Sequence, residues 1–408
     1  MICEDKDKMG NTIFVETRCP MRIFVVHNFY QHAGGEDAVF YKEVEALSTE
    51  HEVRTFTCRN QKDKKGITQF MSYPFNLTIS RKIRQAILDF KPDIVHIHNL
   101  HYAIGPWCIR SIHKLGVPIV MTLHNFRLLC PSASLFYQGE IFTPSIQQDF
   151  PWTAVRMRVL NDSLAKTFLT AFTYWVHRKL GTWNKVAKFI VLSDFAKSLF
   201  LGSTFPVAED KFVVRPNSVN VTPKRTIGGE GFLYIGRLSE EKGIVPLLRA
   251  FANLPFSLSI YGSGPQQDVV ERFAERFEHI HYFGHQPSGI LQTAMENANA
   301  LIVPSVCYEG MPLTIIEAYA QGTPVLASKI GVLKKMVLPL YTGMHFLPNY
   351  LRGIESTVIK WISLDEATKQ QIRENCVAEY QKHYTLQKNM DKLIAIYEEA
   401  IQQQGGKQ

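Results

Sequence analysis

The chain of 408 residues is 46% hydrophobic and 20% charged, with 45 Lys and Arg against 37 Asp and Glu. This length predicts about two domains, and the composition is globular, which excludes disordered, collagen-like and coiled-coil proteins. The formal net charge of +8 predicts an anionic partner, either a phosphorylated substrate, nucleic acid or a lipid surface.

Three features of the sequence favour a cytoplasmic protein. The seven cysteines are odd in number and scattered, without a Cys-x-x-Cys pair, which favours free thiols. The apolar stretch at residues 167–176 is shorter than the ~18–20 residues of a membrane span. Residues 1–20 lack the apolar core of a signal peptide, and we expect them to be a disordered extension, with either Met1 or Met21 as the true start.

Short β-branched runs alternate with helical patterns along most of the chain, which is typical of parallel βαβ units. In the first half, strands are expected at residues 22–27, 93–98, 118–124 and 188–192, and helices near residues 37–48, 80–90 and 104–115. The rhythm then restarts, with strands expected at residues 211–215, 232–236, 257–261, 280–283, 300–304 and 324–327. Two amphipathic helices without a strand between them follow at residues 365–380 and 386–401.

We therefore expect two doubly wound, Rossmann-like α/β domains, at residues 21–205 and 206–384. Ligands of such sheets bind at the carboxyl ends of the strands, so a cleft between the domains is the default site. We expect residues 385–401 to pack back on the first domain and residues 402–408 to be a disordered tail.

The most informative segment follows the strand expected at residues 300–304. Glu309 lies in a loop there, and Pro312 suits the first turn of a helix. The amides of residues 311–314 would then form a phosphate site at the helix N-terminus. Glu309 would lie beside it and Glu317 about one turn further in, so that one carboxylate can bind a sugar and the other a ribose. Alternatively, Glu309 caps the helix and Glu317 is a solvated helix residue.

Two other segments follow strands of the second half. Arg237 stands just after a strand and Lys242 where the next helix begins, so both cations can converge on one diphosphate without a metal ion. Alternatively, they are surface residues that answer the neighbouring glutamates. The glycines of the turn Gly262-Ser263-Gly264-Pro265 permit a ligand to approach the backbone, or they serve an ordinary strand-to-helix turn.

The first strand is followed by Gly34 and Gly35, whose amides can approach a donor diphosphate or simply form a strand-to-helix turn. His96, His98 and His101 crowd the end of another strand. No carboxylate or cysteine accompanies these histidines at a ligand spacing, so we predict buried histidines with backbone partners and no metal site.

Taken in order, these segments resemble the retaining nucleotide-sugar glycosyltransferases of family 4. The family's Glu-x7-Glu pattern falls on Glu309 and Glu317, its Gly-Arg-Leu-x3-Lys-Gly on residues 236–243, and its Gly-x-Gly-Pro on residues 262–265. The family's Pro-Asn-Gly-Val-Asp segment corresponds to residues 216–220, where Ser218 and Asn220 replace its glycine and aspartate. The resemblance runs from about residue 21 to residue 397.

The resemblance implies the GT-B architecture of two Rossmann-like domains facing across a cleft, and transfer of a sugar to a hydroxyl with retention at the anomeric carbon. It implies no protein nucleophile, no cofactor and no required metal. The catalytic residues it implies are His124, Arg237, Lys242 and Glu309. The donor-binding residues are Gly34, Gly35, Gly236, Gly262, Gly264, Gly310, Met311, Pro312, Leu313, Thr314 and Glu317.

By the same resemblance, the setting is bacterial envelope polysaccharide or lipopolysaccharide assembly, with a saccharide or lipid-linked saccharide as acceptor. Two alternatives stay open: a GT-B nucleotide-sugar epimerase, and a catalytically silent protein that binds sugar nucleotides or membranes. Nucleic acid is not expected as a partner, because no helix-turn-helix, RNP-like or zinc pattern accompanies the positive charge.

The segment from Trp152 to Lys188 is basic and amphipathic, with Asp162 as its only acid. On one side of the expected helix lie Leu160, Leu164, Phe168, Phe172, Trp175 and Leu180. On the other side lie Arg158, Asp162, Lys166, Thr173 and His177. Such a helix either lies on an anionic leaflet, which would make the protein peripheral on the inner membrane, or packs its apolar face into the core of the first domain.

Overall fold

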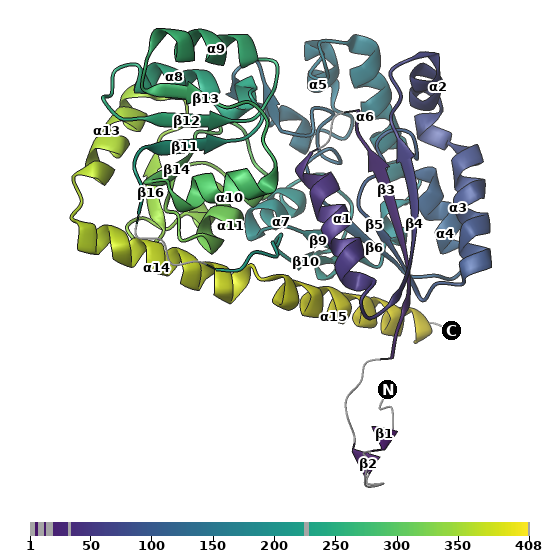
Figure 1. Cartoon of the computed structure of the whole chain (residues 1–408). Coiled ribbons are helices and arrows are strands. Elements are labelled where there is room, and N and C mark those ends of the chain that lie inside the picture. Colours follow the sequence, from purple (N-terminus) through teal and green to yellow (C-terminus); the bar gives the residue numbers. More distant parts are fainter. Residues whose placement is uncertain (1–4, 7–11, 14–18, 32–33, 224–227, 407–408) are drawn as a thin grey trace. The chain divides into compact units, whose positions relative to one another are not determined.

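The computed structural model describes residues 5–6, 12–13, 19–31, 34–223 and 228–406 (Figure 1). Two parallel sheets of six strands each dominate the fold, which confirms the predicted pair of Rossmann-like α/β domains. The chain forms two compact units, and each is described by itself: Met1–Thr122, Val176–Ile190 and Ile394–Gln408 form one, and Leu123–Trp175 and Val191–Leu393 form the other.

The first sheet has the strand order β10-β9-β6-β5-β3-β4. Its strands are β3 (Arg22–Phe29), β4 (Glu52–Arg59), β5 (Ile94–Ile97), β6 (Ile119–Leu123), β9 (Lys188–Val191) and β10 (Phe212–Val214). The β-branched and aromatic residues of β3 form a core strand, since Ile23, Phe24 and Val26 are all fully buried. The strand order reverses between β3 and β5, which places a switch point at their carboxyl ends.

Helices follow these strands along the chain. They are α1 (Gly35–Leu47), α2 (Lys64–Ser72), α3 (Leu77–Phe90), α4 (Trp107–His113), α5 (Trp152–Met157), α6 (Leu164–Lys179) and α7 (Asp194–Leu201). Helices α3 and α4 pack side by side in the first unit (Figure 1). Two antiparallel pairs of two-residue strands complete this half, β1 (Asp5–Lys6) with β2 (Thr12–Ile13) and β7 (Phe136–Tyr137) with β8 (Glu140–Ile141).

The second sheet has the order β13-β12-β11-β14-β15-β16. Its strands are β11 (Phe232–Ile235), β12 (Leu258–Tyr261), β13 (Ile280–Tyr282), β14 (Ala300–Val303), β15 (Val325–Ser328) and β16 (Gly343–Phe346). The order reverses between β11 and β14, so the loops that leave these two strands flank the crevice where doubly wound sheets bind ligands. The sheet buries a large apolar core that includes Phe232, Leu301 and Leu326.

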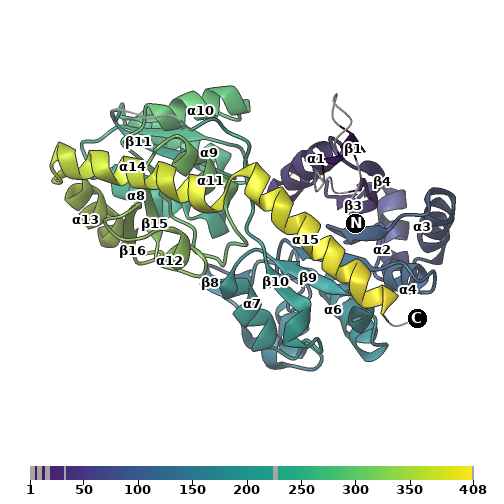
Figure 2. The same ribbon diagram turned by 90° about the horizontal axis from the view of Figure 1, so that it is seen from below.

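The helices of the second sheet complete this unit. They are α8 (Ile244–Phe251), α9 (Gln267–Arg276), α10 (Ser288–Glu296), α11 (Leu313–Ala320), α12 (Leu333–Met336), α13 (Leu351–Ile362) and α14 (Glu366–His383). Helix α8 packs against α9 and α13, and α11 packs against α10 and α14, as Figure 2 shows for the last pair. The final helix, α15 (Leu386–Gly405), contributes its residues from Ile394 onward to the first unit.

Three predictions about the elements differ from the structure. The boundary expected between residues 205 and 206 separates β10 from the first sheet, although β10 is the edge strand of that sheet. The tail is helical as far as Gly405, and Gln403 Nε2 donates to Glu399 Oε1 at 2.9 Å. Within the expected disordered extension, the described residues 5–6 and 12–13 are paired strands, while its residues 1–4, 7–11 and 14–18, like residues 407–408 of the tail, lie outside the described residues.

Candidate functional site

The loops that follow β11 and β14 meet through an ion pair at the switch point of the second sheet. Lys242 ends a short 3-10 turn (Glu240–Lys242) before α8, and its Nζ donates to both oxygens of Glu309, at 2.6 and 2.8 Å. The backbone amide of Val306 also donates to the carbonyl of Glu241 at 2.9 Å. The motif that contains Lys242 and the motif that contains Glu309 are therefore joined directly in the fold.

The electrostatic state of this pair follows from its surroundings. Glu309 is 11% exposed and accepts a third hydrogen bond, from Ser305 Oγ at 2.6 Å. Burial works to lower the pKa of Lys242, but the charge and hydrogen bonds of Glu309 outweigh it, so the pKa of Lys242 is raised. The ammonium stays charged, and with two of its three N–H donors on Glu309, one N–H is left for a ligand.

Arg237 differs from Lys242 in that its side chain is exposed and no other described residue pairs with it. Its backbone is fixed instead, because the Tyr234 hydroxyl donates to the Arg237 carbonyl at 2.8 Å. The guanidinium is thus a free cation with five donors on an anchored backbone. The structure brings Lys242 to Glu309 and leaves Arg237 available to an anion.

The glycines of this region serve the packing of loops. Gly262 has φ +139°, and a Cβ there would lie 1.9 Å from the carbonyl oxygen of Gly236. A Cβ on Gly264 would lie 2.4 Å from the carbonyl oxygen of Leu238. Because the atoms nearest these glycines are backbone atoms of the β11 loop, the turn reading of the Gly-x-Gly segment accounts for both.

The N-terminus of α11 lies next to Glu309 in the chain. The helix begins at Leu313, followed by Thr314, one residue later than predicted. Pro312 is its N-cap and makes no side-chain hydrogen bond to the first turn. Amides of this first turn are thus left without the usual side-chain acceptor, as an anion site requires. The half-buried Glu317 lies one turn further along the same helix.

A segment whose role the sequence left open supports this loop. Asn217 Nδ2 donates to the carbonyl of Met311 at 3.1 Å, and the Asn217 amide lies 3.2 Å from Met311 Sδ. Asn217 therefore holds the residue before the helix cap. Residues 218 and 220 differ from the family segment. Asn217, which matches the segment, nevertheless positions Met311 through this contact.

His124, which directly follows β6, belongs to the same compact unit as Glu309. A Cβ on Gly310 would lie only 2.6 Å from the carbonyl oxygen of His124. The glycine thus allows the backbone after β6 to approach the loop that carries Glu309. The structure brings the backbone of His124 and the Glu309 loop together.

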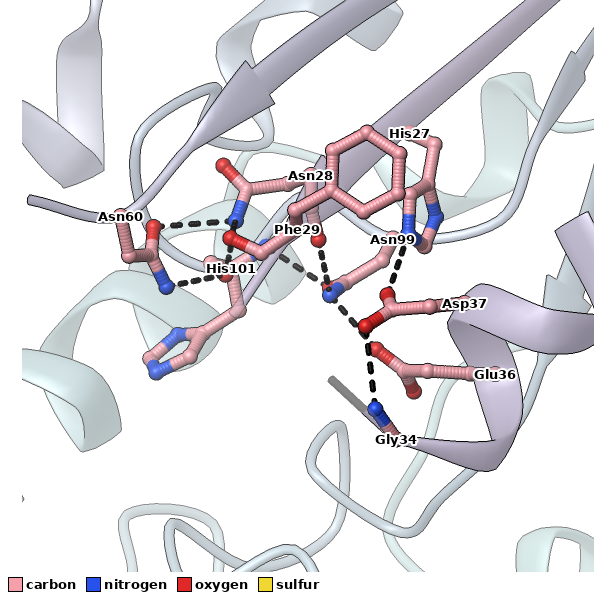
Figure 3. Close-up of polar contacts among 9 residues, drawn as sticks. All are labelled: His27, Asn28, Phe29, Gly34, Glu36, Asp37, Asn60, Asn99 and His101. Atoms are coloured by element: carbon pink, nitrogen blue, oxygen red, sulfur yellow. Dashed lines mark hydrogen bonds and ion pairs between the residues drawn. The ribbon is translucent and has the colours of Figure 1, made fainter. Parts of the chain in front are cut away.

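Gly34 and Gly35 lie in the other unit, after β3 at the switch point of the first sheet; Figure 3 shows Gly34. Gly34 is the N-cap of α1, and its amide donates to Asp37 Oδ2 at 3.0 Å, while Asp37 Oδ1 is 2.8 Å from His27 Nε2. That amide is already used within the turn. Gly35 is the first residue of the helix.

Sequence reasoning missed a set of amide side chains beside these glycines. Asn99 Nδ2 donates to Glu36 Oε1 and to the carbonyl of Asn28, both at 2.8 Å, and Asn60 Nδ2 donates to the carbonyl of His101 at 3.2 Å (Figure 3). These residues come from the ends of three different strands, so only the folded sheet brings them together. The sequence contains one indication of this set, the Asn-x-His run at residues 99–101 that follows β5.

A carboxylate side chain lies beside two of the strand histidines. His96 Nδ1 and His98 Nε2 each lie 3.1 Å from Glu43 Oε1, and the three ligating atoms lie within 4.8 Å of one another. The carboxylate that the sequence did not place beside these histidines comes from α1. Among the described residues, this is a group that could hold a metal ion.

The same atoms also form a hydrogen-bonded network. The Tyr397 hydroxyl of α15 lies 2.7 Å from His96 Nδ1, and His96 Nε2 lies 2.8 Å from Thr122 Oγ1. Burial, followed by the positive potential of His96, lowers the pKa of His98 to about 4, so its ring is neutral near pH 7.

The two doubly wound sheets have the GT-B architecture found in glycosyltransferase structures. The family profile "Glycosyl transferases group 1" matches residues 226–377, and "Glycosyltransferase Family 4" matches residues 33–222. The chain belongs to the group 1 glycosyltransferases and is similar to family 4.

The individual relatives have low sequence identity to this chain but align with a large part of its length. An uncharacterized glycosyltransferase of Methanocaldococcus jannaschii is 23% identical over 312 residues, 75% of each chain. A phosphatidyl-myo-inositol mannosyltransferase of Mycobacterium leprae is 23% identical over 289 residues, 67% of this chain and 65% of that protein. No helix among the described residues has the length and apolarity that crossing a membrane requires.

Two solved structures show the same fold. The sucrose-phosphate synthase of Thermosynechococcus elongatus superposes with a TM-score of 0.69 at 18% identity, over 93% of this chain and 98% of that one. The Anabaena protein HepE in complex with UDP and glucose superposes with a TM-score of 0.64 at 15% identity, over 93% of this chain and 100% of that one.

Proposed function

We propose that the protein is a retaining glycosyltransferase of the hexosyltransferase type, which moves a sugar from a nucleotide-diphosphate sugar to a hydroxyl acceptor. The observation that carries this proposal is the Lys242–Glu309 pair, which joins the two loops at the β11–β14 switch point. A largely buried carboxylate, a cation with one spare donor and the start of α11 are thereby held together at this switch point. Sugar hydroxyls and a diphosphate need these complementary groups.

Each group has a distinct role in the proposed reaction. Arg237, the remaining N–H of Lys242 and the first amides of α11 stabilise the diphosphate as it leaves. Glu309 accepts hydrogen bonds from sugar hydroxyls, and Glu317 accepts them from the ribose. His124 orients the sugar. The acceptor attacks from the face that the diphosphate leaves, so the protein needs no nucleophile and acts mainly by positioning and charge stabilisation.

The donor and acceptor classes are proposed from the site and from similar proteins. The Anabaena protein HepE binds UDP and glucose, and the mycobacterial relative is named as a phosphatidylinositol mannosyltransferase. We infer a nucleotide-sugar donor and a saccharide or lipid-linked saccharide acceptor. Work in bacterial envelope polysaccharide or lipopolysaccharide assembly, by a cytoplasmic enzyme that visits the inner membrane, fits such an acceptor.

The donor is identified first by thermal shift. UDP, GDP, ADP and their sugars are screened, and a ligand at 100 times its Kd should stabilise the protein by ~2.7 kcal/mol. With that donor, turnover and the anomeric configuration of the product are measured. A product of inverted configuration, or release of an epimerised sugar without transfer, contradicts the proposal.

Substitution of the pair tests the assignment directly. Lys242→Ala and Glu309→Ala should each lower turnover by ~100-fold or more, because preorganised charge at the leaving group contributes ~2.7–4 kcal/mol. The matched control is Lys197→Ala, which breaks a 3.1 Å pair with the exposed Glu209 outside the motifs. Turnover of either site variant within a few fold of wild type, at equal melting temperature, would overturn the proposal.

A further inference from the structure

Asn389 is a buried polar residue in the first turn of α15, outside the motifs described above. Its Nδ2 donates to the carbonyl of Pro216, and its own carbonyl accepts a hydrogen bond from Arg215 Nε at 3.2 Å. Asn389 is 5% exposed and Arg215 is 3% exposed. Buried polar groups destabilise a fold unless they are hydrogen-bonded, so these contacts fix the start of α15 to the segment that follows β10.

The next residue of that segment contacts the loop that carries Glu309. Asn217 is 6% exposed, and its Nδ2 donates to the carbonyl of Met311 at 3.1 Å. Met311 directly precedes Pro312, the N-cap of α11. Because a peptide group is planar, the orientation of the Met311 carbonyl also sets the position of the Pro312 nitrogen. Asn217 therefore fixes the point at which α11 begins.

Two consecutive residues thus connect α15 with α11 inside one compact unit. Asn389 holds the carbonyl of Pro216, and that carbonyl belongs to the same rigid peptide group as the nitrogen of Asn217. The ring of Pro216 also locks its φ at about −65°, which leaves this short connection little freedom to adjust. A displacement of the Pro216 carbonyl must therefore displace Asn217 and its contact with Met311.

The C-terminal helices hold the same segment at a second place, which has no such connection. The carbonyls of Val219 and Val221 each lie 3.0 Å from the hydroxyl of Tyr380 in α14. Tyr380 is 3% exposed, so its contact is buried as deeply as that of Asn389. Asn389 differs from Tyr380 in that the residue it holds is adjacent to the one that holds Met311.

We propose that Asn389 is a positioning residue for the donor site, which acts through Pro216 and Asn217 on the start of α11 and the Glu309 loop. This inference rests on the proposed function for the ligand, a nucleoside diphosphate at the first amides of α11. A contact that only stabilised the fold would leave the affinity of the folded protein unchanged. The affinity for the diphosphate is therefore the decisive measurement.

Calorimetric titration of Asn389→Ala with UDP, GDP or ADP, whichever binds wild type, tests the positioning. The Kd should rise about tenfold, which corresponds to about one hydrogen bond to a charged group, at an unchanged stoichiometry. Partial unfolding would instead lower the stoichiometry and leave the Kd of the folded fraction as it is. Asn389→Asp has the same size but cannot donate, so it should have the same effect and replaces Asn389→Ala if that variant does not fold.

Two further variants separate the path through Asn217 from a general effect of the C-terminal helices. Tyr380→Phe removes the hydroxyl that contacts the segment at Val219 and should keep the Kd of wild type. Asn217→Ala should weaken binding as Asn389→Ala does. Since residues that act through one contact are not additive, the double variant Asn217→Ala, Asn389→Ala should bind no more weakly than the weaker single variant.

The inference fails if Asn389→Ala binds the diphosphate as wild type does, if Tyr380→Phe weakens binding equally, or if the two single effects multiply in the double variant. Sugar transfer by wild type is measured in parallel. Wild type that binds the diphosphate but transfers no sugar contradicts the proposed function alone, because the affinities still decide the role of Asn389. Wild type that binds none of the three diphosphates contradicts both.

Discussion

At the scale of single residues, the central feature is the ion pair between Lys242 and Glu309. Lys242 and Glu309 are 67 positions apart, and the motifs predicted that both lie at strand ends of one sheet. The pairing itself was not predictable, because Arg237 and Lys242 were equally suited to a diphosphate on charge alone. The structure shows which cation pairs with the carboxylate, because Glu309 accepts hydrogen bonds from Lys242 Nζ and from Ser305 Oγ.

Gly310 offers a test of the approach between His124 and the Glu309 loop. Gly310→Ala should lower turnover by ~100-fold, because a Cβ 2.6 Å from the His124 carbonyl oxygen must move the loop, and a shift of ~1 Å at reacting groups has that cost. Overpacking should also lower the free energy of unfolding by ~1–3 kcal/mol. Turnover and melting temperature are the measurements.

The control for this substitution is Gly289→Ala in α10, where a Cβ would have no neighbour within 4 Å. This variant should keep the turnover of wild type and be slightly more stable, because alanine favours the helix. If Gly310→Ala is as active as Gly289→Ala, the close approach of the Gly310 and His124 backbones does not contribute to activity.

At the scale of elements, burial decided which strands and helix faces the sequence predicts correctly. The fully buried strands, such as β5 and β14, were predicted to within a residue or two at each end, because a short continuous apolar run between turn residues is typical of a buried strand. Strand β4 was missed because it is an edge strand whose charged residues, Glu52, Arg54 and Arg59, are exposed. Helix α6 was found, but periodicity alone does not say which face is inside, and its threonines replace the usual apolar stripe.

The histidines buried between elements predict an acid-labile fold. Burial lowers the pKa of His177 to about 4, as it does for His98, which faces Glu43, His96 and His27. The unfolded chain binds protons near pH 6.5 and the folded chain does not, so protonation favours unfolding. The free energy of unfolding should therefore fall between pH 6.5 and pH 4, by about 1.4 kcal/mol per pH unit for each histidine.

Urea titrations at a series of pH values measure this slope. His98→Gln should be less steep than wild type over that window, whereas His281→Gln, at an exposed position, should follow wild type. Equal slopes for wild type and His98→Gln would show that His98 is protonated in the folded protein.

At the scale of the whole molecule, the fold tolerates great sequence change. Structures only 15–18% identical cover 93% of this chain. The sequence predicted both sheets because doubly wound topology follows from the alternation of elements. It did not predict the cluster of Glu43, His96 and Tyr397, since that cluster needs α1, β5 and α15 to be placed together.

The charge balance of the two units leads to a prediction about metals. In the second unit, Arg237, Lys242 and the start of α11 supply positive charge where other transferases use a divalent cation, so turnover should persist in excess EDTA. In the first unit, Glu43, His96 and His98 are spaced so that they could hold an ion. EDTA would then lower the melting temperature, and Glu43→Gln would remove that effect and any bound metal detected by elemental analysis. Complete loss of turnover in EDTA, restored by magnesium or manganese in wild type and Glu43→Gln alike, would place a metal at the donor and reject the role given to the two cations.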